Sequence, residues 1–326
     1  MEIENILDIQ NLSVSFKTDQ GTIKAVDNVS FSVQKGEILG IVGESGSGKS
    51  ITALSILRLI PLPDGKIESG KIIFDGEDLL SVRISKMKNI RGKQISMIFQ
   101  EPMSALSPLH KIGNQLVEVL QLHNKINRKE ALNISESWLK KVGIPDAKQR
   151  MNVYPYQLSG GMQQRVMIAM ALMLNPVLVI ADEPTTALDV TIQAQIFDLM
   201  RQMKKNSTSL MLITHDMGVI WDMCNRMIVM YASNIVEQGY VSDIFKKPAH
   251  PYTIGLLNSI PMLNKQIDKL PVITGQVPSP FEKIDGCKFF DRCPYAFERC
   301  AFEKPHFVEI DSNRNVACFL EDKFIK

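Results

Sequence analysis

A glycine-rich segment at residues 43–50 constrains the fold of this chain more than any other feature of its sequence. Its letters, GESGSGKS, match the pattern G-x-x-x-x-G-K-[ST] of a phosphate-binding loop. The run at 38–42 before it is apolar without alternation, as in a strand buried on both faces of a sheet. After it, apolar residues recur near helical spacing until Pro61. A loop of this kind between a buried strand and a helix predicts a nucleotide phosphate site.

The residue types of the loop have chemical reasons. Glycines let backbone N–H groups curl around the β- and γ-phosphates, and the helix N-terminus adds partial positive charge. Lys49 supplies a cation, and the Ser50 hydroxyl can bind Mg²⁺. We therefore expect nucleotide contacts from Gly43, Ser45, Gly46, Gly48, Lys49, Ser50 and Ile51.

The rest of the chain predicts a parallel sheet of crossover units with added parts. Apolar runs at 177–181 and 210–214 flank a helix-compatible stretch at 191–205. Alternation before the loop predicts an antiparallel strand pair that turns near 19–21, with a bulge or bend at 10–11. Polar-faced helical patterns from about residue 115 to 149 predict an inserted helical subdomain.

A second pair of adjacent glycines, Gly160 and Gly161, follows Ser159 and opens an apolar helical run. It predicts another anion-binding helix N-terminus, which one nucleotide does not need from the same chain. Here the chain resembles the ABC ATPase family, whose LSGGQ signature is matched with Met162 in place of the usual glutamine. The resemblance implies that Ser159, Gly160 and Gly161 contact the γ-phosphate of ATP bound to an opposing subunit in a head-to-tail dimer. A helix N-cap with glycines for close packing is the alternative.

Two carboxylates, Asp182 and Glu183, end the buried run at 177–181, where an α/β sheet presents its chemistry. Asp182 is suited to hold Mg²⁺, and Glu183 is suited to polarise the attacking water as general base. Paired acids can also be a solvated strand end, but a phosphate loop in the same chain favours the catalytic interpretation.

The resemblance implies four further roles. His215 matches the switch histidine that senses the γ-phosphate, and Gln100 matches the Q-loop glutamine that contacts Mg²⁺ and the water. Asp189 matches the D-loop residue at the dimer seam. Phe16 is placed like the aromatic residue that stacks on adenine, with an ordinary core aromatic as the alternative. The expected catalytic set is Glu183, His215 and Gln100, with Mg²⁺ held through Ser50, Gln100 and Asp182.

Beyond Gly239 the sequence becomes rich in proline and then carries four cysteines, Cys287, Cys293, Cys300 and Cys318. In a reducing compartment four thiolates suit Zn²⁺ or a [4Fe–4S] cluster rather than disulfides. The short C-x₂₋₄-C knuckle of zinc sites is missing, which favours the cluster. With the segments at 249–253 and 275–278, this region resembles the C-terminal extension of the oligopeptide/dipeptide importer ATPases, some of which carry an iron–sulfur cluster. A reduced cysteine core is the alternative.

The expected fold class is α/β, a P-loop NTPase of the ABC ATPase type. It combines an antiparallel β subdomain, a helical subdomain and a C-terminal cysteine-containing extension. We expect the ATPase domain to span residues 1–240, with the helical subdomain at about 105–170, and the extension to span 241–326.

Composition and the resemblance together predict the location and the partners of the chain. The formal net charge of +2 builds no field for nucleic acid, and no nucleic-acid partner is expected. The N-terminus lacks an apolar leader core, and the longest apolar stretch is shorter than the about 20 residues of a membrane span. The resemblance implies a peripheral protein at the cytoplasmic face of the cell membrane. Its implied partners are two membrane-spanning permease subunits, an extracytoplasmic peptide-binding protein and a second ABC ATPase subunit, for which the family usually uses a paralogue.

The function implied by the resemblance is hydrolysis of ATP to energise uptake of di- and oligopeptides by an ABC importer. A nickel or metal-chelate importer is one alternative, and the cysteines favour peptides over it. The other alternative is a soluble ABC ATPase in DNA repair or translation. Translation-type members usually carry two cassettes and repair members insert long coiled coils, whereas this chain has one phosphate loop, one signature and no sustained heptad run. The resemblance also implies that a binding protein and the membrane subunits choose the cargo.

Overall fold

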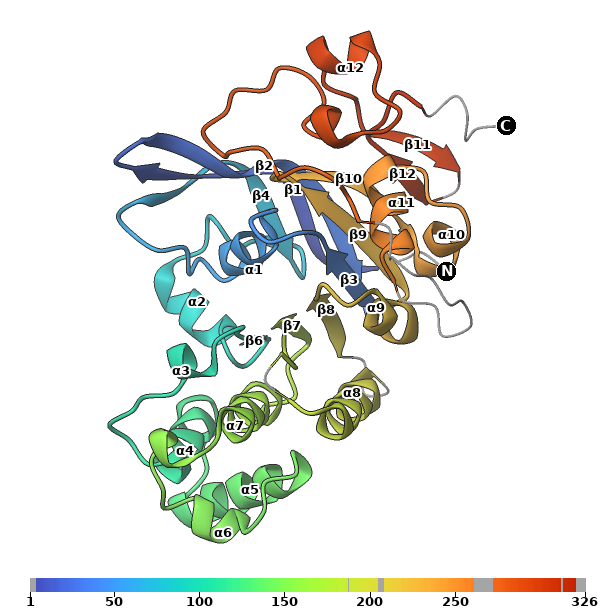
Figure 1. The fold of residues 1–326 in the computed structure, drawn as a ribbon. Coiled ribbons are helices and arrows are strands. Elements are labelled where there is room, and N and C mark those ends of the chain that lie inside the picture. The colour runs from blue at the N-terminus through green and yellow to red at the C-terminus, as the bar shows by residue number, and fades with distance from the viewer. Residues whose placement is uncertain (1–3, 187, 205–207, 261–271, 312, 321–326) are drawn as a thin grey trace. The chain divides into compact units, whose positions relative to one another are not determined.

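The computed structural model describes residues 4–186, 188–204, 208–260, 272–311 and 313–320. The chain divides into two compact units. Unit 1 comprises residues 1–6, 33–38 and 81–212, and unit 2 comprises residues 7–32, 39–80 and 213–326. Both units combine strands and helices, as Figure 1 shows.

Unit 2 contains a four-stranded sheet in the order β2-β1-β4-β5. Its strands are β1 (Asn5–Thr18), β2 (Gly21–Gln34), β4 (Gly65–Phe74) and β5 (Glu77–Asp78). β1 runs antiparallel to β4, and its register shifts between Gln10 and Ser13, where Asn11 takes a φ of 49°. The expected hairpin and the expected bulge are therefore both confirmed.

A second set of strands in unit 2 carries the phosphate loop. β3 (Ile38–Val42) runs parallel to β9 (Arg226–Tyr231), which pairs antiparallel with β10 (Asn234–Tyr240). β10 in turn pairs with β12 (Arg314–Val316), and β12 pairs with β11 (Val308–Asp311). Every residue of β3 and β9 is buried. For β3 this confirms the prediction from its unbroken apolar run. C-terminal strands thus extend the sheet of the loop strand, and the domain limits at 240 and 241 stay a prediction.

Short helices and turns complete unit 2. They are α1 (Lys49–Ile56), α9 (Met217–Met223), α10 (Val241–Lys246), α11 (Pro251–Asn258), η2 (Phe290–Arg292) and α12 (Glu298–Phe302). α1 ends at Ile56 and not near Pro61, because Arg58 already takes a left-handed φ of 52°. A core around Tyr231, Tyr252 and Phe289 joins β9 to the C-terminal residues.

Unit 1 holds strands in the order β8-β7-β6, namely β8 (Ser209–Ile213), β7 (Leu178–Asp182) and β6 (Ile95–Ile98). β6 and β7 are parallel, and every residue of both is buried. Its helices are α2 (Ile84–Ile90), α3 (Pro102–Ala105), α4 (Ile112–His123), α5 (Arg128–Lys141), α6 (Ala147–Arg150), η1 (Pro155–Gln157), α7 (Gly160–Leu172) and α8 (Val190–Lys204). α5 packs against α4, α6 and α7, which agrees with the helical insertion expected in this part of the chain.

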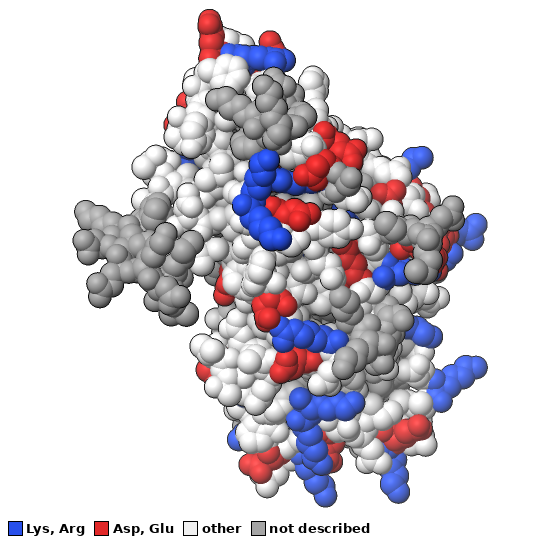
Figure 2. Space-filling model, turned by 90° about the vertical axis from the view of Figure 1, so that its right-hand side faces the viewer, with Lys and Arg blue, Asp and Glu red and all other residues white. Residues whose placement is uncertain are grey.

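Two surface properties bear on function. Among the described residues, none of the helices is both long and apolar enough to traverse a bilayer. On the face shown in Figure 2, basic and acidic side chains are interspersed. A surface of mixed sign gives little long-range attraction to the phosphates of nucleic acid on that face.

Candidate functional site

The phosphate loop of unit 2 curls around its own lysine. Lys49, the first residue of α1, is buried, and its Nζ donates to the carbonyl oxygens of Gly43 at 2.7 Å and Glu44 at 2.9 Å. Nζ also lies 3.3 Å from Ser47 Oγ. The ammonium group is thus fixed inside the curve of the loop, as its expected role as the cation for phosphate requires.

Two glycines of the loop are required by close approach of other backbone. A Cβ on Gly43, at a φ of 152°, would lie 2.1 Å from the Met230 carbonyl oxygen. A Cβ on Gly48, at a φ of 100°, would lie 2.4 Å from the Ala25 carbonyl oxygen. Both distances are shorter than any real side chain tolerates, so these positions accept only glycine. Ser45 and Gly46 are exposed, and a ligand can therefore reach them.

Phe16 lies on β1 opposite Gly65 of β4. Its ring passes 2.8 Å from the place where a Cβ of Gly65 would stand, so the missing side chain makes room for the ring. Phe16 is half-buried, a state that suits both a stacking face for adenine and a strand-closing aromatic. Its expected adenine contact stays a prediction.

In unit 1, Gln100 and Glu183 are brought together although 83 positions separate them in the sequence. Gln100 Nε2 donates to Glu183 Oε2 at 3.2 Å. Asp182 is the last residue of β7 and is buried, and Glu183 follows it at the strand end. The Glu183 carbonyl oxygen accepts hydrogen bonds from Gln164 Nε2 at 3.5 Å and from Thr186 Oγ1 at 3.4 Å. The bond from Gln100 holds the carboxylate that is expected to act as base, and the other two bonds hold the backbone of Glu183.

The backbone of Glu183 has a φ of 46°. A non-glycine residue in the left-handed region costs on the order of 1–3 kcal/mol and is kept where surrounding structure enforces it. Such positions cluster at functional sites, so this conformation agrees with a catalytic role for Glu183.

The expected signature residues open α7. Ser159 is the N-cap, and its Oγ accepts a hydrogen bond from Met162 N at 3.4 Å. Apart from its chain neighbours and the backbone of its own helix, no atom of the described residues lies within 4 Å of a Cβ placed on Gly160. Packing within the described chain therefore does not explain this glycine, which favours a requirement set by a ligand or another subunit over the close-packing alternative.

The two remaining expected site residues lie in turns before helices. Asp189 Oδ1 accepts from Ile192 N at 3.0 Å, so Asp189 caps the start of α8 in unit 1. His215 is exposed in unit 2 between β8 and α9, and Asp216 beside it caps α9. Unit 1 thus carries Gln100, Asp182, Glu183, Asp189 and the signature, and unit 2 carries the phosphate loop, Phe16 and His215.

The four C-terminal cysteines, Cys287, Cys293, Cys300 and Cys318, line one small cavity of unit 2, next to His250 and Phe289. All of them are free thiols. Burial raises the pKa of Cys287 to about 11 and that of Cys318 to about 12. Among the described residues, no group of three or more His, Cys, Asp or Glu side chains is arranged so that it could hold a metal ion. The four thiols thus lie at one cavity but are not arranged as metal ligands. This arrangement gives no support to the expected [4Fe–4S] cluster.

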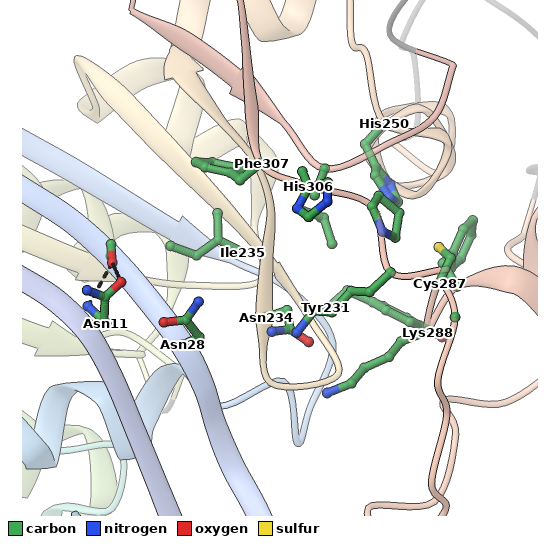
Figure 3. A pocket seen from close by; sticks show the side chains of 17 residues that line it. Asn11, Asn28, Tyr231, Asn234, Ile235, His250, Cys287, Lys288, His306 and Phe307 are labelled. Atoms are coloured by element: carbon green, nitrogen blue, oxygen red, sulfur yellow. Dashed lines mark hydrogen bonds between the residues drawn. The ribbon is translucent and has the colours of Figure 1, made fainter. Parts of the chain in front are cut away.

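A larger cavity of about 380 Å³ lies in unit 2 between the β1–β2 hairpin, the β9–β10 pair and C-terminal residues. Figure 3 shows Asn11 and Asn28 toward one end, and His250 and Cys287 toward the other. Residues 43–50 do not line it, so it is not the expected nucleotide site.

Two residues that contact the phosphate loop were not assigned a role from the sequence. Tyr252, at the start of α11, and Arg292, in η2, both contact Glu44. The segment around Tyr252 carried part of the resemblance, but no spacing rule links it to a loop more than 200 positions earlier.

The family described as "ABC transporter" matches residues 26–186, and the one described as "Oligopeptide/dipeptide transporter, C-terminal region" matches residues 236–300. The probable peptide ABC transporter ATP-binding protein y4tR of Sinorhizobium fredii (strain NBRC 101917 / NGR234) is 48% identical over 322 residues, covering 98% of this chain and 96% of that protein. The oligopeptide transport ATP-binding protein AppD of Bacillus subtilis (strain 168) is 48% identical over 322 residues, covering 98% of each.

Solved structures agree with these matches. The dimeric structure of MJ0796, described as a bacterial ABC transporter cassette, has a TM-score of 0.66 and 27% identity, covering 72% of this chain and 98% of that chain. The structure of cbiO1 from Clostridium perfringens has a TM-score of 0.60 and 26% identity, covering 75% of this chain and 92% of that chain. The expected fold class is confirmed. The chain therefore belongs to the ATP-hydrolysing subunits of ABC transporters, and within them to the group with the C-terminal region of oligopeptide and dipeptide transporters.

Proposed function

We propose that this chain energises the uptake of di- and oligopeptides across the cytoplasmic membrane, as the ATPase subunit of an ABC importer. One observation carries the cargo class: the similarity continues past the ATPase residues into the C-terminal region at 236–300 and covers nearly the whole of peptide-transport relatives. We place the chain at the cytoplasmic face of the membrane as a peripheral protein. Its partners would be two permease subunits, an extracytoplasmic peptide-binding protein and a second ATPase subunit, for which the family usually uses a paralogue.

The hydrolytic step would use the residues to which the resemblance assigns roles. Water attacks the γ-phosphorus of ATP, the bond to the β–γ bridging oxygen breaks, and Glu183 takes up the proton of the water. Gln100 holds the Glu183 carboxylate through its 3.2 Å bond and so orients the base. Ser50, Asp182 and Gln100 would hold Mg²⁺, which neutralises charge on the phosphates when it is bound. Lys49 and the loop amides bind the phosphates, and His215 senses the γ-phosphate.

A second subunit would complete the site. Its Ser159, Gly160 and Gly161 counterparts would contact the γ-phosphate from across a head-to-tail dimer, with Asp189 at the seam. The open space around Gly160 and the exposed N-terminus of α7 support this arrangement, because neither is used within the described chain. The dimeric structures of MJ0796, similar in fold to this chain, give it further support.

The cysteines are proposed to hold a [4Fe–4S] cluster through Cys287, Cys293, Cys300 and Cys318. The proposal rests on the resemblance alone, because the four thiols line one small cavity without an arrangement, among the described residues, that could hold a metal ion. Acid-labile sulfide, iron and zinc analysis of anaerobically purified protein tests the proposal. About four irons and four sulfides per chain would support it. Stoichiometric zinc, or no metal at all, would contradict it.

Uptake assays test the cargo. A strain that lacks the gene for this chain should lose uptake of labelled di- and tripeptides, and the wild-type gene should restore it whereas a Glu183→Gln gene should not. Loss of labelled nickel uptake with normal peptide uptake would favour the metal-chelate importer instead. Cell fractionation addresses the soluble alternative, since association with ribosomes or DNA after removal of the permease genes would contradict a transport role.

A further inference from the structure

Two side chains of the C-terminal region contact one residue of the phosphate loop. Tyr252 Oη accepts a hydrogen bond from the backbone N–H of Glu44 at 2.9 Å. Arg292 Nη1 lies 3.0 Å from Glu44 Oε2 and also donates to Tyr231 Oη at 3.3 Å. Tyr252 is fully buried, and the Arg292 side chain is only 6% exposed. The Glu44 side chain is 31% exposed, so the ion pair is shielded from water mainly on the side of Arg292, and it is stronger than a fully exposed pair of the same length.

Tyr252 is itself fixed by a chain of buried hydrogen bonds. His250 Nδ1 accepts from Tyr252 N at 3.0 Å and so caps α11. Burial lowers the pKa of His250 to about 3, which keeps the imidazole neutral and able to accept this bond. The buried Glu237 carboxylate accepts from Ala249 N and His250 N, each at 2.9 Å. The segment that presents the Tyr252 hydroxyl is therefore anchored on β10.

Arg292 is fixed by aromatic rings and by backbone. Its guanidinium carbon lies 5.7 Å from the Tyr231 ring centre and 5.9 Å from that of Phe289. Tyr231, Tyr252 and Phe289 pack with ring centroids 4.7 to 5.5 Å apart. Arg292 Nε donates to the Thr274 carbonyl oxygen at 3.1 Å. A side chain held on this many sides can impose its position on Glu44 rather than follow it.

The backbone of Glu44 is thus held at both of its polar groups. Tyr252 accepts from its N–H, and Lys49 Nζ donates to its carbonyl oxygen at 2.9 Å. A phosphate loop binds through backbone amides that point at one place, and fixing them beforehand removes an ordering cost from binding. We propose that Tyr252 and Arg292 are positioning residues of the ATP site, which preorganise the phosphate loop through Glu44. The C-terminal region would then set nucleotide affinity as well as any cargo-specific role it has.

The test compares nucleotide affinity in full-length variants. Tyr252→Phe removes one acceptor and keeps the ring, and Arg292→Met removes the charge and keeps an unbranched side chain. We expect each to weaken binding of a fluorescent ATP analogue about five- to tenfold, the effect of leaving one buried partner unmatched. Arg292→Lys, which keeps a cation near Glu44, should recover part of the loss. The matched control is Arg299→Met, which removes an exposed pair with Glu303 in the same region and should leave affinity unchanged.

A double-mutant cycle between Arg292 and Glu44 separates positioning from general destabilisation. Glu44→Gln alone should weaken binding as Arg292→Met does, and the double variant should be little worse than either. In the assembled transporter the single variants should raise KM for ATP more than they lower kcat. Unchanged affinity in Tyr252→Phe and Arg292→Met overturns the proposal, as do additive effects in the cycle. If Tyr252→Phe does not fold, Glu44→Gln decides the question, because it changes no side chain of the aromatic core, and unchanged affinity in Glu44→Gln then overturns the proposal.

Discussion

Replacing Arg314 by methionine tests how much its ion pair with the buried Glu237 carboxylate stabilises the fold. Glu237 is the residue that anchors the segment before Tyr252. Glu237 Oε1 lies 3.0 Å from Arg314 Nη2, and both side chains are almost fully buried. Arg314 Nη2 also donates to the Lys247 carbonyl oxygen. Methionine keeps an unbranched apolar chain but leaves the carboxylate without its cation.

The size of the effect follows from these contacts. Removing one partner of a buried ion pair costs about 3–5 kcal/mol, because the other charge stays buried and uncompensated. Glu237 keeps two backbone donors, at Ala249 and His250, which offset part of that cost. We therefore expect Arg314→Met to lower the free energy of unfolding of unit 2 by about 3 kcal/mol, at the lower end of that range.

Tryptophan fluorescence can follow unfolding from within unit 2. The sequence has two tryptophans, and Trp221 on α9 belongs to unit 2 whereas Trp138 on α5 belongs to unit 1. In a Trp138→Phe background, urea unfolding followed at Trp221 reports the transition that disrupts unit 2. Both the parent and the Arg314→Met chain are compared in this background.

Two further variants make the result decisive. Arg299→Met breaks an exposed i,i+4 pair with Glu303 and should cost about 0–1 kcal/mol. Adding Glu237→Gln to Arg314→Met removes the orphaned charge and should recover part of the lost stability. A loss below about 1 kcal/mol for Arg314→Met, or no recovery in the double variant, would refute the reasoning that an uncompensated charge is the cause.

Three other predictions address the site and the fold. Glu183→Gln should keep ATP binding but lower kcat at least about 100-fold, because an amide cannot take up the proton of the water; nucleotide titration and phosphate release measure the two, and an active variant would remove Glu183 from the role of base. Gly43→Ala should abolish nucleotide binding, because its Cβ would lie 2.1 Å from the Met230 carbonyl oxygen. Gly21→Ala is the control: its φ of 131° also strains an alanine, but apart from its chain neighbours no atom of the described residues lies within 4 Å of the added Cβ, so nucleotide binding should be kept. Burial alone would raise the pKa of Asp27, but its ion pairs with Lys304 and other lysines lower this pKa to about 2. Ionised Asp27 therefore stabilises the fold above about pH 4, and this contribution is lost as the pH falls through 2. Asp27→Asn should therefore lower the thermal midpoint at pH 7 and have progressively less effect toward pH 2, and a penalty that is equal at both pH values would contradict the ion-pair explanation.

Local patterns predicted the elements that carry the chemistry. The buried run of β3, the glycine loop and the start of α1 are adjacent in sequence, so their letters alone define the motif. Asp182 and Glu183 likewise follow their strand directly. The end of α1 was placed too late, because the left-handed backbone of Arg58 has no marker as clear as Pro61.

Contacts between distant segments were not readable in the same way. β12 has only three residues and no periodic signal, and its pairing with β10 depends on tertiary packing. The hydrogen bond from Glu44 to Tyr252 joins residues 208 positions apart. A tyrosine after a proline is common in sequences, so nothing at residue 252 indicates a contact with the phosphate loop. The hydrogen bond between Gln100 and Glu183 is visible only in the structure. The resemblance implies a role in the reaction for both residues but does not imply that their side chains are in contact.

The left-handed φ of Glu183 means that the residue proposed as general base has a strained backbone. Glycine or asparagine would relax that residue, since both tolerate this region better than glutamate does. Selection for thermal stability alone would thus favour replacement of Glu183 by one of these residues, whereas selection for ATP turnover would keep the glutamate. At Glu183, directly after β7, stability and catalysis therefore favour different amino acids.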